Sequence, residues 1–411
     1  MQAIVNNILV GSALLAFQVS TAVVAQPVIS EAGKAAIAQI ATNATNRGDV
    51  PGVVTLIVNR AGVIYQSSAG KQDVGRGIAM PPDAIFRIAS MTKPVTSAAI
   101  MMLMEAGKLN LDDPVSKYLP EYAARPVITK FNPADASYAT RPAKSEMTIR
   151  HLMEHTSGLG YGFTDPMIKR IVDVTKKTEP ELPLAQDPGT KWQYSASTRV
   201  LGWIVEKVSG EKLDAFLQNQ IFAPLKMVDT GYAVPSGKLS RVVTVHSRTG
   251  GKLTETPNGL TQESPVRGDG GLYSTAQDYS RFVRMFLNGG TLDGAKILSA
   301  KSVQMMSENP ANSIVIQTQP DADPARTRPF PIGEGKDKFG LGFQITAADP
   351  RYAQFRSPGS LSWGGINNTH FWIDPKRQIA GIVMMQVLPF YDEASVGVLR
   401  GIEEVVYKNL K

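Results

Sequence analysis

Residues 86–94 read FRIASMTKP, and an apolar stripe at helical spacing follows them. The members of the stripe are Val95, Ala98, Ala99, Met102, Leu103 and Ala106, with Gly107 as the stop. Pro94 has no N–H group, so a helix tolerates it only in the first turn, where the amides have no partner within the helix. The sequence therefore predicts a core helix with Ser90 at its N-terminus.

Ser90 and Lys93 are three residues apart and share one face of this helix. A serine hydroxyl becomes a good nucleophile only when a base takes its proton, and a lysine amine has a reference pKa of about 10.4. Burial and a neighbouring cation or phenol would lower that pKa, and the helix N-terminus would stabilise an oxyanion at the Ser90 amide. The pair predicts a nucleophile with its base, although an isolated Ser-x-x-Lys is more often an N-cap before a solvated lysine.

Longer stretches of sequence favour the catalytic interpretation. Residues 86–93, 104–109, 111–115, 151–159, 188–195 and 270–275 resemble the serine β-lactamase and penicillin-binding-protein superfamily. Within it the chain is most similar to the class C β-lactamase-related carboxylesterases, called family VIII. The resemblance covers nearly all of residues 26–411. It implies a β-lactamase-like fold, α/β plus all-α, in which an antiparallel sheet is flanked by helices and joined to a second, mainly helical lobe.

The second motif of that superfamily begins with a tyrosine, and Tyr194 stands at the matching position. A phenol can relay protons when a lysine cation stabilises its phenolate, so Lys93 and Tyr194 should titrate as a coupled pair. Either of them could be the formal base. The lactamase motif has Asn at its third position, whereas this chain has Ala196. The side chain that would hold a substrate amide is therefore missing.

The third motif, usually Lys-Thr-Gly on a strand, corresponds to Trp363-Gly364-Gly365-Ile366. The glycines allow close approach of substrate and backbone, and the resemblance implies that the Ile366 amide is the second oxyanion donor. Trp363 replaces a charge that would bind a carboxylate, which favours uncharged acyl groups. A competing match, Arg248-Thr249-Gly250, lies between polar and β-branched residues and is expected to be a hairpin turn.

Composition excludes several classes of function. The 411 residues include no Cys, which rules out disulfides, thiolate nucleophiles, iron–sulfur clusters and Cys-ligated zinc. A net charge of +7 without a basic run does not indicate a nucleic-acid partner. His151 and His155 have the spacing of a zinc peptidase motif, but the resemblance implies a structural helix end there. We expect neither a metal nor an organic cofactor.

The chain ends predict one sheet. A helix is expected over residues 31–46, strands over 53–58, 63–69, 369–373 and 378–387, and a closing helix through Val398 to Val406.

We assign residues 26–89 and 335–411 to an α/β lobe and 90–334 to a mainly helical lobe. Its helices are expected after Asp113, from Thr148 to Gly158, over 200–208, and from Thr275, in a capping box with Asp278, to Leu287. Residues 310–338 are expected to form a long loop.

Residues 1–25 contain no charged side chain, an apolar run over 8–17 and a Val23-Val24-Ala25 cleavage pattern. They predict a signal peptide and a periplasmic or secreted protein without a stable membrane span, although a misassigned start or a buried helix would look similar.

The sequence thus predicts a serine hydrolase that cleaves small-molecule carboxylic esters. A β-lactamase, a D-amino-acid peptidase, an acyltransferase and a non-catalytic wall-binding protein of the same fold are the alternatives.

Overall fold

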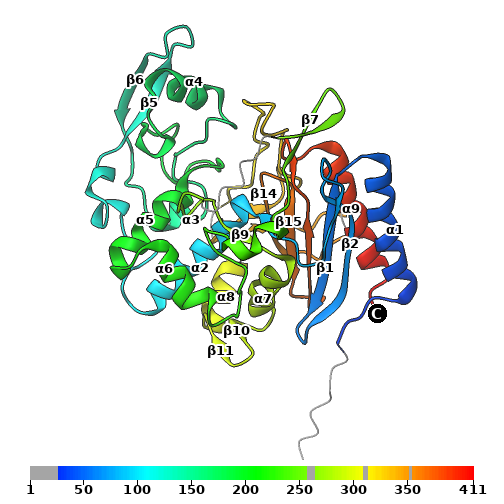
Figure 1. The fold of residues 1–411 in the computed structure, drawn as a ribbon. Helices are drawn as coiled ribbons and strands as arrows, with labels where there is room; N and C mark the ends of the chain where they lie inside the picture. The colour runs from blue at the N-terminus through cyan, green and yellow to red at the C-terminus, as the bar shows by residue number, and fades with distance from the viewer. Residues whose placement is uncertain (1–25, 257–263, 309–312, 351–353) are drawn as a thin grey trace, which may run out of the picture.

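A computed structural model describes residues 26–256, 264–308, 313–350 and 354–411. The largest sheet among these residues is antiparallel and has the strand order β12-β13-β14-β15-β16-β1-β2-β3 (Figure 1). The strands are β1 (Gly52–Asn59), β2 (Val63–Asp73), β3 (Ile78–Ala79), β12 (Lys338–Phe339), β13 (Gln344–Ile345), β14 (Leu361–Gly365), β15 (Thr369–Asp374) and β16 (Ile379–Met384). β1 pairs with β16 in the register Val54 to Met384, so the two chain ends share one sheet, as predicted.

Helices cover both faces of the sheet. α1 (Glu31–Arg47) and α9 (Glu393–Lys408) pack against each other on one face, where Figure 1 shows them in blue and red. Val398, Ile402 and Val406 of α9 are buried in one cluster with Ile37 of α1 and Trp372 of β15. On the other face, α7 (Ala276–Leu287) contacts β1 and β16. The apolar stripes of the two terminal helices therefore face the sheet as their spacing predicts.

The remaining elements lie mainly beside this sheet. The helices are α2 (Thr92–Glu105), α3 (Ile149–Met153), α4 (Pro166–Thr175), α5 (Ser197–Ser209), α6 (Leu213–Leu217) and α8 (Ala300–Ser307), with shorter turns η1 (Ala89–Met91), η2 (Val115–Lys117), η3 (Pro120–Tyr122), η4 (Glu179–Glu181), η5 (Gln218–Phe222) and η6 (Ser236–Arg241). Short strands pair as β4 (Phe86–Arg87) with β9 (Tyr273–Ser274), β5 (Pro126–Phe131) with β6 (Tyr138–Pro142), β7 (His246–Thr249) with β8 (Lys252–Glu255) and β17 (Val387–Leu388), and β10 (Thr291–Leu292) with β11 (Ala295–Lys296).

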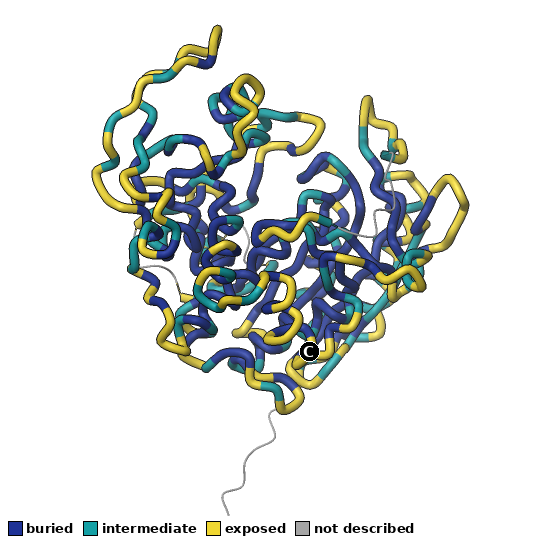
Figure 2. The backbone as a smooth tube through the Cα atoms, turned by 60° about the vertical axis from the view of Figure 1, so that its left-hand side comes forward, coloured by how far each residue is buried: buried dark blue, intermediate teal, exposed yellow. Residues whose placement is uncertain are grey.

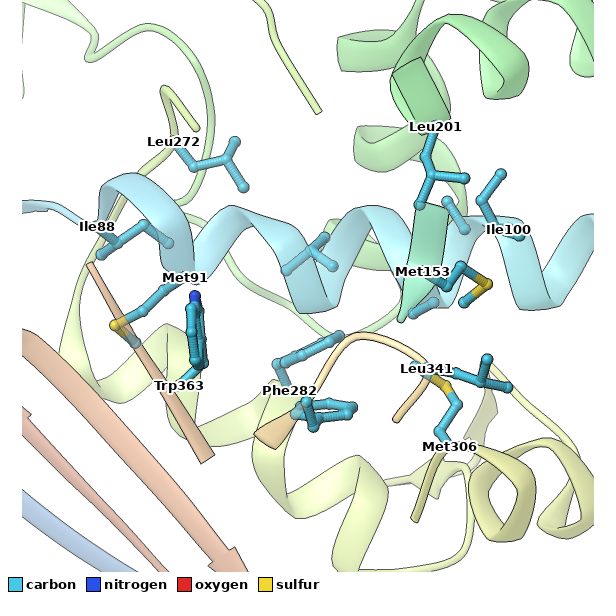
Figure 3. Packing of buried hydrophobic residues seen from close by; sticks show 14 of the residues in the cluster. Ile88, Met91, Ile100, Met153, Leu201, Leu272, Phe282, Met306, Leu341 and Trp363 are labelled. Carbon is cyan, nitrogen blue, oxygen red and sulfur yellow. The ribbon is translucent and has the colours of Figure 1, made fainter. Parts of the chain in front are cut away.

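Helix α2 runs through the core. Figure 2 shows the buried segments gathered in the interior, and Figure 3 shows apolar side chains around this helix, with Leu201 of α5 and Met153 of α3 beside Ile100. α2 is buried nearly all round, including Ile100 and Met101, rather than along the predicted stripe alone. A helix that is buried on every side belongs to the core of a protein, and α2 packs there against α5 and α6.

Three local predictions were wrong. The helix from Thr148 ends at Met153, not at Gly158, because the chain turns at His155, which has a positive φ of 55°. Asp113 does not cap a helix; its carboxylate accepts from Asn110 and Tyr118 beside the short turn η2. At α7, Thr275 caps as predicted, but the Asp278 carboxylate accepts from the Asp229 amide and the Thr230 hydroxyl, so it does not complete a capping box.

The division into two lobes stays a prediction. α7 falls within residues 90–334 and nevertheless packs on the sheet. The signal-peptide prediction concerns residues outside the described part of the chain. Among the described residues, no helix combines the length and apolarity that crossing a membrane requires.

Candidate active site

Ser90 lies in the tight turn η1, immediately before α2. Ala89 has the left-handed φ of 44°, and the turn is held by main-chain and side-chain contacts: the Ile88 amide donates to the Leu272 carbonyl at 3.0 Å, and the Tyr279 hydroxyl donates to the Met91 carbonyl at 2.9 Å. Pro94 is the third residue of α2 and thus lies in its first turn. The structure therefore places Ser90 at the helix N-terminus that the sequence predicts.

The Lys93 amine is buried and directed at Ser90. Lys93 is only 1% exposed, and its Nζ atom lies 3.2 Å from Ser90 Oγ. Nζ also donates to the Tyr161 hydroxyl at 3.2 Å and to the main-chain carbonyl of Asp269 at 2.8 Å. Burial lowers the pKa of Lys93 to about 7, with the Asp269 carboxylate acting in the opposite direction. A substantial fraction of this amine is therefore neutral near pH 7 and able to accept a proton.

The Tyr194 side chain completes a three-residue cluster with Ser90 and Lys93. Its hydroxyl interacts with Ser90 through a side-chain hydrogen bond and accepts from the indole Nε1 of Trp363 at 3.4 Å. Lys93 Nζ lies 4.7 Å from the centre of the Tyr194 ring. Burial raises the pKa of Tyr194 more than these two hydrogen bonds lower it. The phenol thus remains protonated, which favours Lys93 over Tyr194 as the base.

Strand β14 brings the third segment against the nucleophile turn. Trp363, Gly364 and Gly365 are its last three residues, and Ile366 follows in the turn to β15. A Cβ atom on Gly365 would lie 2.2 Å from the Ile88 carbonyl oxygen, so the two backbones are in direct contact there. The amide of Ile366 is therefore held close to the segment that carries Ser90.

Replacement of Gly365 by Ala is expected to lower kcat/KM about tenfold to hundredfold, because the added methyl group must push β14 away from residue 88. The measurement is steady-state turnover of an ester, the substrate class that the sequence predicts, beside thermal unfolding. Gly397→Ala is the matched control, because a Cβ there meets no atom within 4 Å. An unchanged kcat/KM in Gly365→Ala would show that the distance between β14 and the turn does not matter.

Aromatic side chains form one wall beside these residues. The Trp363 ring lies 5.0 Å from the Tyr194 ring and 5.0 Å from the Phe339 ring, and Figure 3 shows it next to Met91. Phe330 packs edge-on against Tyr194 at 5.6 Å. Trp363, which the resemblance places where lactamases have a lysine, is thus part of an aromatic wall.

Three residues around Lys93 were not predicted from the sequence. The Tyr161 hydroxyl donates to Asp269 Oδ2 at 2.6 Å, and Arg199 Nη2 donates to the same oxygen at 2.9 Å. The Asp269 carboxylate is only 4% exposed. Tyr161 and Asp269 each adjoin a stretch that carries the resemblance, 151–159 and 270–275, but neither belongs to a spacing pattern. Only the fold brings them together.

The competing motifs have other partners. His151 Nδ1 accepts from the Thr148 amide, and His155 Nδ1 lies 3.1 Å from the Ser195 hydroxyl, so the two imidazoles do not converge. Within the described ranges, no group of three or more His, Cys, Asp or Glu side chains is placed to bind a metal. Arg248 and Thr249 lie in β7, which forms the predicted hairpin with β8, and Arg248 pairs with Asp392.

Several known proteins are similar to this chain. The family model described as Beta-lactamase matches residues 37–398. The chain is 30% identical over 361 residues to acyltransferase calJ of Penicillium decumbens (82% of this chain, 83% of that protein), and 29% identical over 369 residues to lovastatin esterase of Penicillium rubens (84% and 91%). The structure resembles a mutant of simvastatin synthase LovD from Aspergillus terreus, with a TM-score of 0.79 and 27% identity, covering 92% of this chain and 95% of that one.

Proposed function

The chain belongs to the Beta-lactamase family, and we propose that within this family it hydrolyses carboxylic esters through an acyl-enzyme on Ser90. Relatives with this fold include esterases and acyltransferases, which places the chain in a superfamily of serine hydrolases and acyl transferases. The observation that carries the proposal is the buried Lys93 amine, with a pKa of about 7, at 3.2 Å from the Ser90 hydroxyl. A base with a pKa near the working pH is suited to general base catalysis.

Acylation follows from the positions of three side chains. Neutral Lys93 takes the proton of Ser90 while Oγ attacks the ester carbonyl carbon, and the amides of Ser90 and Ile366 stabilise the oxyanion. The Tyr194 hydroxyl gives a proton to the departing alkoxide, and the C–O bond of the ester breaks. Lys93, now protonated, restores the proton of Tyr194 through a water molecule. A water molecule then attacks the acyl carbon while Lys93 takes one of its protons. The bond between this carbon and Ser90 Oγ breaks, Oγ regains a proton from Lys93, and the acid leaves.

Two features support esters rather than β-lactams or peptides. Ala196 cannot hold a substrate amide, and Trp363 offers an aromatic surface where a lactamase lysine would bind a carboxylate. An alkoxide is also a better leaving group than an amine.

The test compares p-nitrophenyl butyrate with nitrocefin, a chromogenic cephalosporin. We expect kcat/KM for the ester to exceed that for nitrocefin at least about a hundredfold, since both amide- and carboxylate-binding groups are replaced. A fluorophosphonate should label the wild type on Ser90, as located by peptide mass spectrometry, with Ser90→Ala as the background control. Faster nitrocefin turnover would contradict ester preference, and an unlabelled Ser90 would contradict the acyl-enzyme.

Transfer of the acyl group to an alcohol is a second candidate function. It is supported by the 30% identity to acyltransferase calJ over most of both chains. Product analysis by mass spectrometry, with a primary alcohol added during ester turnover, separates the two. A transferase would convert most of the acyl-enzyme to the new ester at millimolar alcohol, whereas a hydrolase would release mainly the acid.

A further inference from the structure

A buried chain of hydrogen-bonded polar groups begins at the Lys93 amine. It runs from the Lys93 amine to the Tyr161 hydroxyl, from there to the Asp269 carboxylate, and on to the Arg199 guanidinium. We propose that Asp269 and Arg199 are positioning residues which, through Tyr161, aim the lone pair of the Lys93 amine at the Ser90 hydroxyl. This inference rests on the proposed function, because it concerns the base of that reaction.

Counting hydrogens on the neutral amine supports the proposal. A neutral lysine has two N–H bonds and one lone pair, so three directions need partners. One partner is the Asp269 carbonyl, which can only accept, at 2.8 Å. A second is the Tyr161 hydroxyl at 3.2 Å, whose own proton is committed to Asp269 Oδ2 at 2.6 Å, so towards Lys93 it can only accept. Both N–H bonds are thereby used, and the lone pair faces Ser90 Oγ at 3.2 Å.

Arg199 stabilises the orientation in which the Tyr161 hydroxyl donates to Asp269. Its Nε and Nη2 donate to Asp269 Oδ2 at 3.2 and 2.9 Å, and its side chain is only 14% exposed. A carboxylate that receives these bonds remains ionised and can only accept, which forces Tyr161 to donate to it. An amide at position 269 is neutral and has a single acceptor oxygen, so it holds Tyr161 and Arg199 more weakly than the carboxylate does. Where its NH2 group takes the place of Oδ2, the Tyr161 hydroxyl must accept from it and turn its own proton towards the Lys93 lone pair. The base would be blocked without any loss of packing.

The charged groups around Lys93 make the pH dependence of kcat/KM a second measurement of the proposal. The titratable or charged groups that surround its amine are Tyr161, Tyr194, His155, Asp269, Arg199 and Arg267. After burial, the Asp269 carboxylate raises the pKa of Lys93, and Arg199 and Arg267 lower it. Asp269→Asn should therefore shift the acidic limb of the kcat/KM profile to lower pH, and Arg199→Gln should shift it to higher pH. Structural damage alone would not shift the acidic limb of the kcat/KM profile in opposite directions in the two variants.

The experiment measures kcat and KM for p-nitrophenyl butyrate from pH 5 to 10, together with the second-order rate of fluorophosphonate labelling. We expect shifts of about one pH unit in the two directions, and a kcat about tenfold to hundredfold lower in Asp269→Asn and Tyr161→Phe with KM nearly unchanged. Arg199→Lys keeps the charge and should return the limb towards the wild-type position, which also covers the case that Arg199→Gln folds poorly.

Tyr407→Phe is the matched control, because its hydroxyl also donates to a carboxylate, Asp374 Oδ2 at 2.9 Å, in the α9 layer. It should leave the profile unchanged. Acidic limbs that stay in place, or that move together in Asp269→Asn and Arg199→Gln, would overturn the proposal. Failure of the wild type to hydrolyse esters or to be labelled on Ser90 would instead overturn the proposed function, so the two failures are distinguishable.

Discussion

Replacement of Lys93 by Met is expected to lower kcat/KM for p-nitrophenyl butyrate by about three orders of magnitude. Methionine keeps the unbranched apolar stem of the side chain but has no amine to take the Ser90 proton, which lysine reaches over 3.2 Å. The wild-type activity should fall below pH 7 as Lys93 becomes protonated, because its pKa is about 7. The variant should show neither the activity nor this acidic limb. Stopped assays of ester hydrolysis over pH 5 to 10 measure both.

The same variant should change how stability depends on pH. The folded state holds the pKa of Lys93 at about 7, below that of an unfolded lysine, so above pH 7 the unfolded chain binds a proton that the folded chain has released. The wild-type free energy of unfolding should therefore gain about 2 kcal/mol from this residue between pH 7 and pH 9. Urea titrations of the wild type and of Lys93→Met at pH 7 and pH 9 measure this contribution to the free energy of unfolding. An equal pH dependence would contradict a depressed pKa at Lys93.

The sequence predicts well those features that depend on neighbouring residues. Pro94 in the first turn and Gly107 after the last one define α2 with little help from the rest of the chain, since a missing N–H and a positive φ are local constraints. Sheet formation by both chain ends also follows from local patterns, because the strands and their turns are readable one by one. The pairing of β1 with β16 then confirmed the expected sheet.

The polar surroundings of Lys93 could not be predicted in this way. Tyr161, Arg199 and Asp269 come from three segments, and each alone resembles an ordinary surface or core residue. Their significance depends on burial, since a carboxylate that is 4% exposed requires partners, and those partners define the geometry at the amine. The early end of α3 has a similar cause: His155 is buried against Ser195 and Tyr194, and this tertiary contact overrides the helical pattern.

Replacement of Tyr194 by Phe is expected to lower kcat/KM for ethyl butyrate by about three orders of magnitude. The raised pKa of Tyr194 keeps its hydroxyl protonated, next to Ser90 and the indole of Trp363, where it can protonate a departing alkoxide. For p-nitrophenyl butyrate the loss should be only about tenfold, because nitrophenolate leaves without a proton. The measurement is the ratio of the losses in kcat/KM for the two esters. General damage to the site would lower both values alike and would leave this ratio near one.

Tyr122→Phe controls for the removal of a buried hydroxyl, because that group donates to the Pro180 carbonyl at 3.2 Å in a different part of the structure. Both esters should react with this control as with the wild type. An equal loss for the two esters in Tyr194→Phe would mean that the phenol acts before the alcohol departs, in the attack of Ser90. Lys93 would then not be sufficient as the base, and the proton of Ser90 would have to pass through Tyr194, against the direction that burial gives to its pKa.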